Sequence, residues 1–177
     1  MRVAILSSGG KDSAAAWWWA MCKGWSIEAL VTVTITDDDS PMFQIPSTHL
    51  VERQAESAGI PWVEVRTTGQ TPDDIAALEE ALSHLQLDGF VSGALRSDYQ
   101  KSRLERMAER LGMHSWTPLW HQSGYNHLKG MIDHGFEIMM TGVSAEGLTQ
   151  KWLGCVLTPD TFTELATLAK KHRFHVE

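Results

Sequence analysis

Cysteine is scarce in this sequence. Its 177 residues include two, Cys22 and Cys155, which lie far apart and in no C-x-x-C arrangement. A disulfide framework or a cysteine zinc site is therefore not expected, whereas a reducing cytoplasmic setting is. Long apolar runs are lacking too, since nothing approaches the roughly 20 residues of a membrane-spanning helix. The apolar run 3–6 soon meets two glycines and two charged residues, so we also expect no secretory signal.

Positive charge is also in short supply. The chain has 15 Lys and Arg residues against 22 Asp and Glu residues, a formal net charge of −7. That sign disfavours nucleic acid as a partner, because phosphate backbones select basic surfaces. A magnesium-bound nucleotide stays compatible, because local backbone dipoles can bind it. Eight histidines are present, without the spacing typical of metal ligands.

What the chain does have is an alternation of strand and helix patterns. Short apolar or β-branched runs predict strands at 3–6, 27–34, 62–65, 90–92 and 136–141. Capping residues and glycine stops predict helices at 12–23, 47–58, 71–85, 98–111 and 158–171. This order predicts an α/β fold, a three-layer sandwich whose mainly parallel sheet is covered on both faces. We expect a single domain over residues 1–177, with residues from about 115 onward forming smaller elements beside a crevice.

Several helices carry their own signals. Ser47 and Ser97 are placed to act as N-caps, and Thr71 precedes Pro72 in the same role, with Pro72 at the first helical position. The run Trp17–Trp19 covers most of the circumference of the first helix. It predicts a helix buried between the sheet and its neighbours.

A loop of unusual composition joins the first strand to the first helix, with the sequence Ser8-Gly9-Gly10-Lys11-Asp12-Ser13. Paired glycines let successive backbone N–H groups converge on one anion, and the helix adds the positive end of its dipole. Lys11 adds a full positive charge, and Asp12 suits a Mg²⁺ ion better than a phosphate. The spacing is neither that of a Walker A loop nor that of a dinucleotide fingerprint. The alternative is a plain glycine-rich turn, and the full order of residues favours anion binding.

A second polar block follows the fourth predicted strand. It should face the same crevice, because ligands of parallel sheets bind beyond the carboxyl ends of the strands. Ser97 and Gln100 have the spacing of a capping box. Gln100 and Arg103 share one helix face, where an amide and a guanidinium suit a carboxylate or an adenylate phosphate. Asp98 and Glu105 are acidic candidates for metal, ammonia or a substrate cation, and a solvated position is equally favoured for Glu105.

These motifs resemble those of known proteins. The loop Ser8–Ser13 resembles the PP-loop of the N-type ATP pyrophosphatases, and Gly93–Glu105 resembles a block of the diphthine–ammonia ligase family. Pro118–Trp120, Gly147–Leu148 and Trp152–Gly154 are similar to further parts of that family, so the likeness covers nearly the whole chain. The resemblance implies a HUP-like (adenine nucleotide alpha hydrolase-like) sheet. It also implies ATP and Mg²⁺ as cofactors, with ATP cleaved between the α and β phosphates.

The resemblance implies a reaction as well. ATP would adenylate a carboxylate and release pyrophosphate, after which ammonia would form the amide, and the substrate would be diphthine on a translation elongation factor. ATP would bind at Ser8, Gly9, Gly10, Lys11, Asp12 and Ser13, with Mg²⁺ at Asp12. The catalytic candidates are Lys11, Asp12, Asp98 and Arg103, and the substrate-binding candidates are Ser97, Asp98, Gln100, Arg103 and Glu105.

The sequence departs from the family pattern in two places. Cys155 stands where the family commonly has a basic residue, so either a phosphate or substrate contact is lost or the change is neutral. Phe174–Val176 resembles a stretch that leads, in the family, into a Gly-Glu-rich motif, whereas this sequence stops at Glu177. We therefore expect ATP binding with weak or no ligation of diphthine. Two alternatives stay open: a PP-loop enzyme on another substrate, such as tRNA thiolation, and a nucleotide-binding module without ligase activity.

Overall fold

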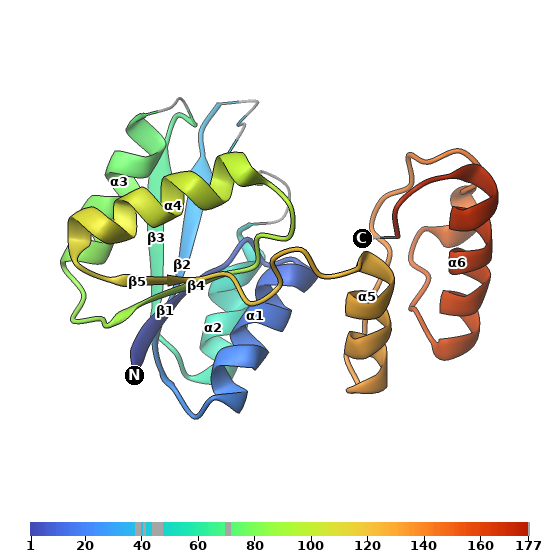
Figure 1. Cartoon of the computed structure of the whole chain (residues 1–177), viewed down its shortest axis with the longest axis horizontal. Helices are drawn as coiled ribbons and strands as arrows, with labels where there is room; N and C mark the ends of the chain where they lie inside the picture. Colours follow the sequence, from blue (N-terminus) through green and yellow to red (C-terminus); the bar gives the residue numbers. More distant parts are fainter. Residues whose placement is uncertain (38–39, 41, 44–47, 70–71, 177) are drawn as a thin grey trace. The chain divides into compact units, whose positions relative to one another are not determined.

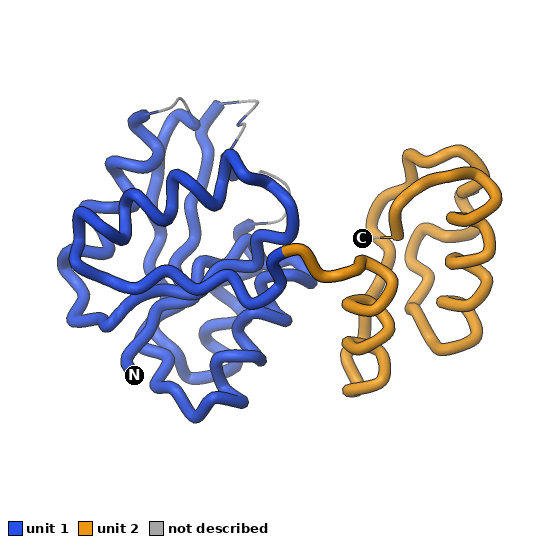
Figure 2. The backbone as a smooth tube through the Cα atoms, in the orientation of Figure 1, with its two compact units in different colours: residues 1–120 blue, residues 121–177 orange. Residues whose placement is uncertain are grey.

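The structure is a computed structural model that describes residues 1–37, 40, 42–43, 48–69 and 72–176. The chain forms two compact units, Met1–Trp120 and His121–Glu177, which Figure 2 shows in different colours. Among the described residues, no helix has the length and apolar character needed to cross a membrane.

The first unit is built on one sheet of parallel strands. They are β1 (Arg2–Leu6), β2 (Ser26–Ile35), β3 (Trp62–Thr67), β4 (Gly89–Ser92) and β5 (His114–Trp116), in the spatial order β3-β2-β1-β4-β5. The central strand β1 has β2 on one side and β4 on the other, with Leu6 opposite both Val31 and Ser92. The order of the strands reverses between β1 and β4. In sheets of this kind, the crevice for a ligand opens at the carboxyl ends of the strands flanking that point.

Helices cover both faces of this sheet (Figure 1). The helices α3 (Asp73–Ser83) and α4 (Asp98–Leu111) pack on one face, and α1 (Lys11–Cys22) and α2 (Leu50–Ala58) pack on the other. Such a sheet is buried on both sides, which is why its strands are rich in apolar and β-branched residues. The predicted α/β three-layer sandwich with a parallel sheet is therefore confirmed.

The core beneath α3 and α4 fixes the position of α4. Val31, Val33 and Phe90 of the sheet belong to one buried cluster with Leu78 of α3 and Met107 of α4, and none of the five is more than 6% exposed. Full burial of one such side chain contributes about 1.5–3 kcal/mol. The N-terminal end of α4, which carries the second polar block, is thereby held against the sheet.

The tryptophan-rich helix differs from its prediction. The run Trp17–Trp19 is not buried all round, because Trp18 is 39% exposed. The buried positions of α1 are occupied by smaller residues, among them Ala15, Ala16 and Ala20. Small side chains let the helix lie close to the sheet. Of the three rings, Trp18 is exposed, whereas Trp17 and Trp19 are half-buried.

Other boundaries were predicted with mixed success. Ser97 is the N-cap of α4 as expected. Pro72 is the N-cap of α3 and not its first helical residue. The expected caps Ser47 and Thr71 lie outside the described residues. Strand β5 was not predicted, since its three residues, His114–Trp116, form no apolar run.

The second unit is mainly helical. It contains α5 (Gly124–Asp133), the 3₁₀ helix η1 (Gln150–Trp152) and α6 (Pro159–His172). The prediction of a strand at 136–141 is wrong: Met139 makes an isolated antiparallel bridge with Val156, and this described segment forms no strand. Met139 is 57% exposed, so the segment lacks the buried face that stabilises a strand. The single domain over 1–177, and the place of these elements beside the crevice, stay predictions.

Candidate nucleotide-binding site

The loop Ser8–Ser13 lies at the carboxyl end of the central strand, where it leads into α1. Gly9 has a φ of 80°, a left-handed conformation that glycine adopts without strain. The N–H of Gly9 donates to Ser7 Oγ at 3.2 Å, and Ser13 Oγ donates to the carbonyl of Gly10 at 2.9 Å. Gly10 is the N-cap of α1 and has no side chain to bond the first N–H groups of the helix. This end of α1 is therefore suited to an anion.

Lys11 and Asp12, the first two residues of α1, form an ion pair. Lys11 Nζ lies 2.8 Å and 2.9 Å from the two carboxylate oxygens of Asp12. Asp12 lines the pocket described below, and Lys11 does not. Mg²⁺ is commonly held by one or two carboxylates together with substrate phosphates. Asp12 therefore fits a Mg²⁺ ion that arrives with a nucleotide, although Lys11 Nζ would have to release the carboxylate first.

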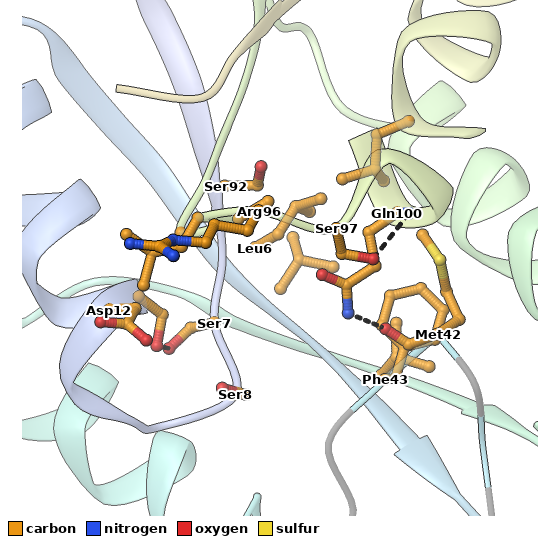
Figure 3. Close-up of a pocket in the computed structure, with 17 residues that line it drawn as sticks. Leu6, Ser7, Ser8, Asp12, Met42, Phe43, Ser92, Arg96, Ser97 and Gln100 are labelled. Atoms are coloured by element: carbon orange, nitrogen blue, oxygen red, sulfur yellow. Dashed lines mark hydrogen bonds between the residues drawn. The ribbon is translucent and has the colours of Figure 1, made fainter. Parts of the chain in front are cut away.

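A pocket of about 350 Å³ opens beside this loop (Figure 3). Its volume is within the range of small-molecule sites. Three stretches of the chain line it: β1 with the loop and start of α1, β2 with the loop after it, and β4 with the start of α4. Its lining residues are Leu6, Ser7, Ser8, Asp12, Ser13, Val31, Val33, Met42, Phe43, Ser92, Gly93, Ala94, Leu95, Arg96, Ser97, Gln100 and Leu104. The pocket thus lies at the reversal of strand order, where the fold predicts a ligand.

One end of the pocket is apolar. Val31 and Val33 of β2, Met42 and Phe43 after it, and Leu104 of α4 all line the pocket. The N–H groups of Met42 and Phe43 donate to Ser40 Oγ at 3.2 Å and 3.1 Å, which shapes this part of the loop. Apolar walls beside backbone polar groups suit a flat heterocycle such as a purine.

Two residues of the second polar block, Ser97 and Gln100, line the pocket. Ser97 Oγ accepts a hydrogen bond from the N–H of Gln100 at 3.3 Å and caps α4. Gln100 Nε2 donates to the carbonyl of Met42 at 2.7 Å, as the dashed line in Figure 3 shows. Ser97 and Gln100 therefore share one pocket with Ser8, Asp12 and Ser13, as the sequence predicted.

Other predicted residues do not line the pocket: Gly9, Gly10, Lys11, Asp98, Arg103 and Glu105. The guanidinium of Arg103 lies 3.4 Å from the centre of the Tyr99 ring and donates to the carbonyl of Tyr99 at 3.3 Å. Glu105 forms an ion pair with Lys101 one helical turn away. The structure thus gives Arg103 and Glu105 local partners on α4.

The loop after β4 is packed tightly against the start of α1. A β-carbon placed on Gly93 would lie less than 3 Å from backbone atoms of Asp12 and Ser13. This close approach requires glycine and ties the two polar stretches of the pocket together.

Three features of the site were not predicted from the sequence. Arg96 lines the pocket and, among its described lining residues, is the one cation. Ser92 lines it with a hydroxyl that is buried and has no hydrogen-bond partner in the described part of the chain. Outside the lining, Gln54 of α2 donates to the carbonyl of Gly9 at 3.2 Å and so helps to hold the loop Ser8–Ser13. The Arg96 signal was visible in the sequence, since this cation lies in the short stretch between a buried strand and the predicted cap Ser97.

Comparisons with known proteins identify the family of this chain. The model of the diphthamide synthase N-terminal domain matches residues 1–115, a stretch that contains the whole pocket lining. Proteins named diphthine–ammonia ligase from Rattus norvegicus and Homo sapiens are each 30% identical to this chain, covering 99% of it and 74% of their own length. The chain belongs to the diphthine–ammonia ligase family. It shares the family's PP-loop and its HUP-like sheet.

One longer relative and one solved structure extend the comparison. The diphthine–ammonia ligase of Schizosaccharomyces pombe is 30% identical over 99% of this chain, which spans 32% of that longer protein. A crystal structure described as a predicted subunit of tRNA methyltransferase from Methanocaldococcus jannaschii superposes with a TM-score of 0.53 at 19% identity. The superposition covers 99% of this chain and 89% of that one, and it concerns the fold alone.

Proposed function

We propose that this chain is an ATP-dependent ligase that adenylates a carboxylate and then forms an amide with ammonia. The observation that carries the proposal is the shared pocket, to which the phosphate loop contributes Asp12 and Ser13, and the family-specific block contributes Ser97 and Gln100. The names of the relatives support diphthine as the carboxylate substrate. The translation elongation factor that would carry it is what the family resemblance implies.

ATP would occupy the pocket in one orientation. Its phosphates would lie at the Ser8–Ser13 end, where the dipole of α1 and the charge of Lys11 favour anions. Its adenine would lie at the apolar end beside Met42 and Phe43. When Mg²⁺ is bound with the nucleotide, Asp12 would hold it, and the ion would neutralise part of the phosphate charge.

The proposed reaction has two steps, adenylation of the carboxylate and formation of the amide. A carboxylate oxygen attacks the α-phosphorus. The bond between the α-phosphorus and the oxygen that bridges it to the β-phosphorus breaks, and pyrophosphate leaves with both bonding electrons. Ammonia then attacks the acyl carbon, loses a proton, and displaces AMP to leave the amide. The protein mainly positions these groups and stabilises negative charge on the phosphates.

The remaining candidates would serve the acyl substrate. Ser97 and Gln100 lie inside the pocket and would contact the nucleotide or the acyl group directly. Asp98, Arg103 and Glu105 lie on α4 outside the lining and would bind the substrate beyond the nucleotide. A reducing cytoplasmic setting fits the two free cysteines, Cys22 and Cys155.

The products of ATP cleavage test the proposal. We expect AMP and pyrophosphate in equal amounts when the chain is given ATP, Mg²⁺, ammonium and a diphthine-bearing elongation factor. Anion-exchange chromatography of the nucleotides and a pyrophosphate assay would measure them. ADP and phosphate as the main products would rule out adenylation. Omitting ammonium is the control, because adenylation alone would then give no more than about one turnover.

A further inference from the structure

The charges that line the pocket are nearly balanced before any nucleotide binds. Asp12 and Arg96 are the charged residues among the described lining, and Asp12 is already paired with Lys11. A triphosphate brings several negative charges into this space. A guanidinium is well suited to meet them, because it offers up to five N–H donors in a planar fork that matches phosphate oxygens.

The loop that carries Arg96 is fixed at both ends. At one end, Gly93 approaches the backbone of Asp12 too closely for any side chain. At the other end, Ser97 caps α4 through its hydrogen bond with the N–H of Gln100. Arg96 is therefore presented by a short, anchored segment, and little ordering of the backbone is needed when a ligand binds.

The direction of the side chain agrees with a role at the phosphate end. Figure 3 shows Arg96 extending from the loop after β4 toward the side of the pocket where Asp12 and Ser7 lie. It extends away from the apolar end formed by Met42 and Phe43. An anion bound at the start of α1 would lie within reach of this guanidinium.

Ser92 gives a second, independent indication of a ligand. Its side chain lines the pocket, is 5% exposed, and has a hydroxyl without a hydrogen-bond partner in the described part of the chain. A buried hydroxyl in this state costs stability, so such groups are normally paired. A phosphate oxygen in the pocket would pair it.

We propose that Arg96 is a phosphate-binding residue that holds ATP from the β4 side of the pocket, opposite the phosphate loop, with Ser92 as a second donor. This inference rests on the proposed function for the identity of the ligand. It assigns the second positive charge of the site to a residue outside the PP-loop.

Titration calorimetry with ATP and with adenosine tests the assignment, without any acyl substrate. For Arg96→Gln we expect ATP to bind about 10- to 100-fold more weakly, the loss typical of a hydrogen-bonded charge, while adenosine binding is unchanged. Arg96→Lys should lose less, because the charge is kept. Arg106→Gln is the matched control: Arg106 is exposed on α4 and does not line the pocket, so ATP binding should stay at the level of the parent.

The outcomes separate this inference from the proposed function. Unchanged ATP affinity in Arg96→Gln would overturn the inference, and so would an equal loss for ATP and adenosine, which indicates a structural role. Lys11→Ala, measured in parallel, reports on the phosphate loop itself. A parent protein that binds ATP but never forms AMP and pyrophosphate would contradict the proposed ligase reaction and leave the Arg96 result intact.

Discussion

Gly93 lies so close to Asp12 that a β-carbon on Gly93 would be 2.6 Å from the carbonyl carbon of Asp12 and 2.7 Å from its oxygen. These atoms belong to the backbone, which cannot rotate away as a flexible side chain can. The contact joins the loop after β4 to the start of α1.

We predict that Gly93→Ala weakens ATP binding at least about tenfold, because the added methyl must displace the start of α1. Overpacking of this kind costs about 1–3 kcal/mol of the free energy of unfolding. Calorimetry and urea denaturation would measure the two effects. Gly130→Ala adds the same methyl to α5 where nothing lies within 4 Å, and should stabilise the protein by about 0.5–1 kcal/mol. ATP affinity equal to that of the parent in Gly93→Ala would contradict the prediction.

Lys11 should matter for the nucleotide far more than for stability. Its ion pair with Asp12 is about a quarter to a third exposed on each side, and such pairs contribute little to folding. We predict that Lys11→Ala binds ATP about tenfold or more weakly with a nearly unchanged melting temperature. Lys129→Ala, which removes a similar ion pair with Asp133 on α5, is the control and should leave ATP binding unaffected.

Ser92 offers a test in which stability and binding move in opposite directions. Replacing Ser92 by alanine removes a buried hydroxyl that is unpaired in the described structure. The free energy of unfolding should therefore rise, by about 1 kcal/mol, when no ligand is present. ATP affinity should fall several-fold, because a donor to the phosphate is lost. A variant that loses stability and keeps its affinity would show that the hydroxyl has an internal role.

Asp74 predicts a specific dependence of stability on pH. Its side chain is fully buried, and this burial raises the pKa of the carboxyl, although the N–H of Ile75 donates to it at 2.7 Å. The folded state then binds a proton at Asp74 more tightly than the unfolded chain does. The contribution of Asp74 to stability is therefore greatest below the ordinary carboxyl pKa of about 3.9 and falls as the pH rises through the raised value.

Asp74→Asn should remove this dependence. We expect the variant to gain free energy of unfolding relative to the parent as the pH rises through the acidic range. Urea denaturation of both proteins at a series of pH values would show it. A difference between the two proteins that is constant with pH would refute the prediction. Asp73→Asn makes the same chemical change on the exposed neighbouring residue and serves as the control.

Local signals in the sequence predicted much of the fold. Ser97 was correctly placed at the start of α4, because a cap needs one side chain and an N–H three residues on. Helix α5 was missed, since it begins at Gly124 and contains Gly130, two residues that weaken a helical pattern. The strand expected at 136–141 failed because apolar composition cannot show whether a neighbouring strand exists.

The sequence predicted those parts of the site whose polar residues lie next to one another in the chain. The loop Ser8–Ser13 combines glycines, charge and hydroxyls in one stretch, so the sequence predicts anion binding there, and the structure places Ser8, Asp12 and Ser13 in the lining of the pocket. Met42 and Phe43 were not predictable, because they lie in an irregular loop and reach the pocket only through the tertiary fold. Gln100, which donates to the carbonyl of Met42, lies 58 residues later in the chain. Arg103 was predicted to face the ligand, and the structure places it against Tyr99.

The central position of β1 has a consequence for how the first unit folds during synthesis on the ribosome. Strand β1 pairs with β2 early in synthesis, but its other neighbour comes late. The N–H of Arg2 donates to the carboxylate of Asp88 at 2.7 Å, and the N–H of Asp88, 86 residues later in the chain, donates to the carbonyl of Arg2 at 2.8 Å. Pairing over such a separation slows folding. The nascent chain therefore contains the stretch Ser8–Ser13 well before the end of β4 and the start of α4, which line the other side of the pocket. ATP binding should begin abruptly once residues up to about 104 have left the exit tunnel, and it can report the completion of this unit during translation.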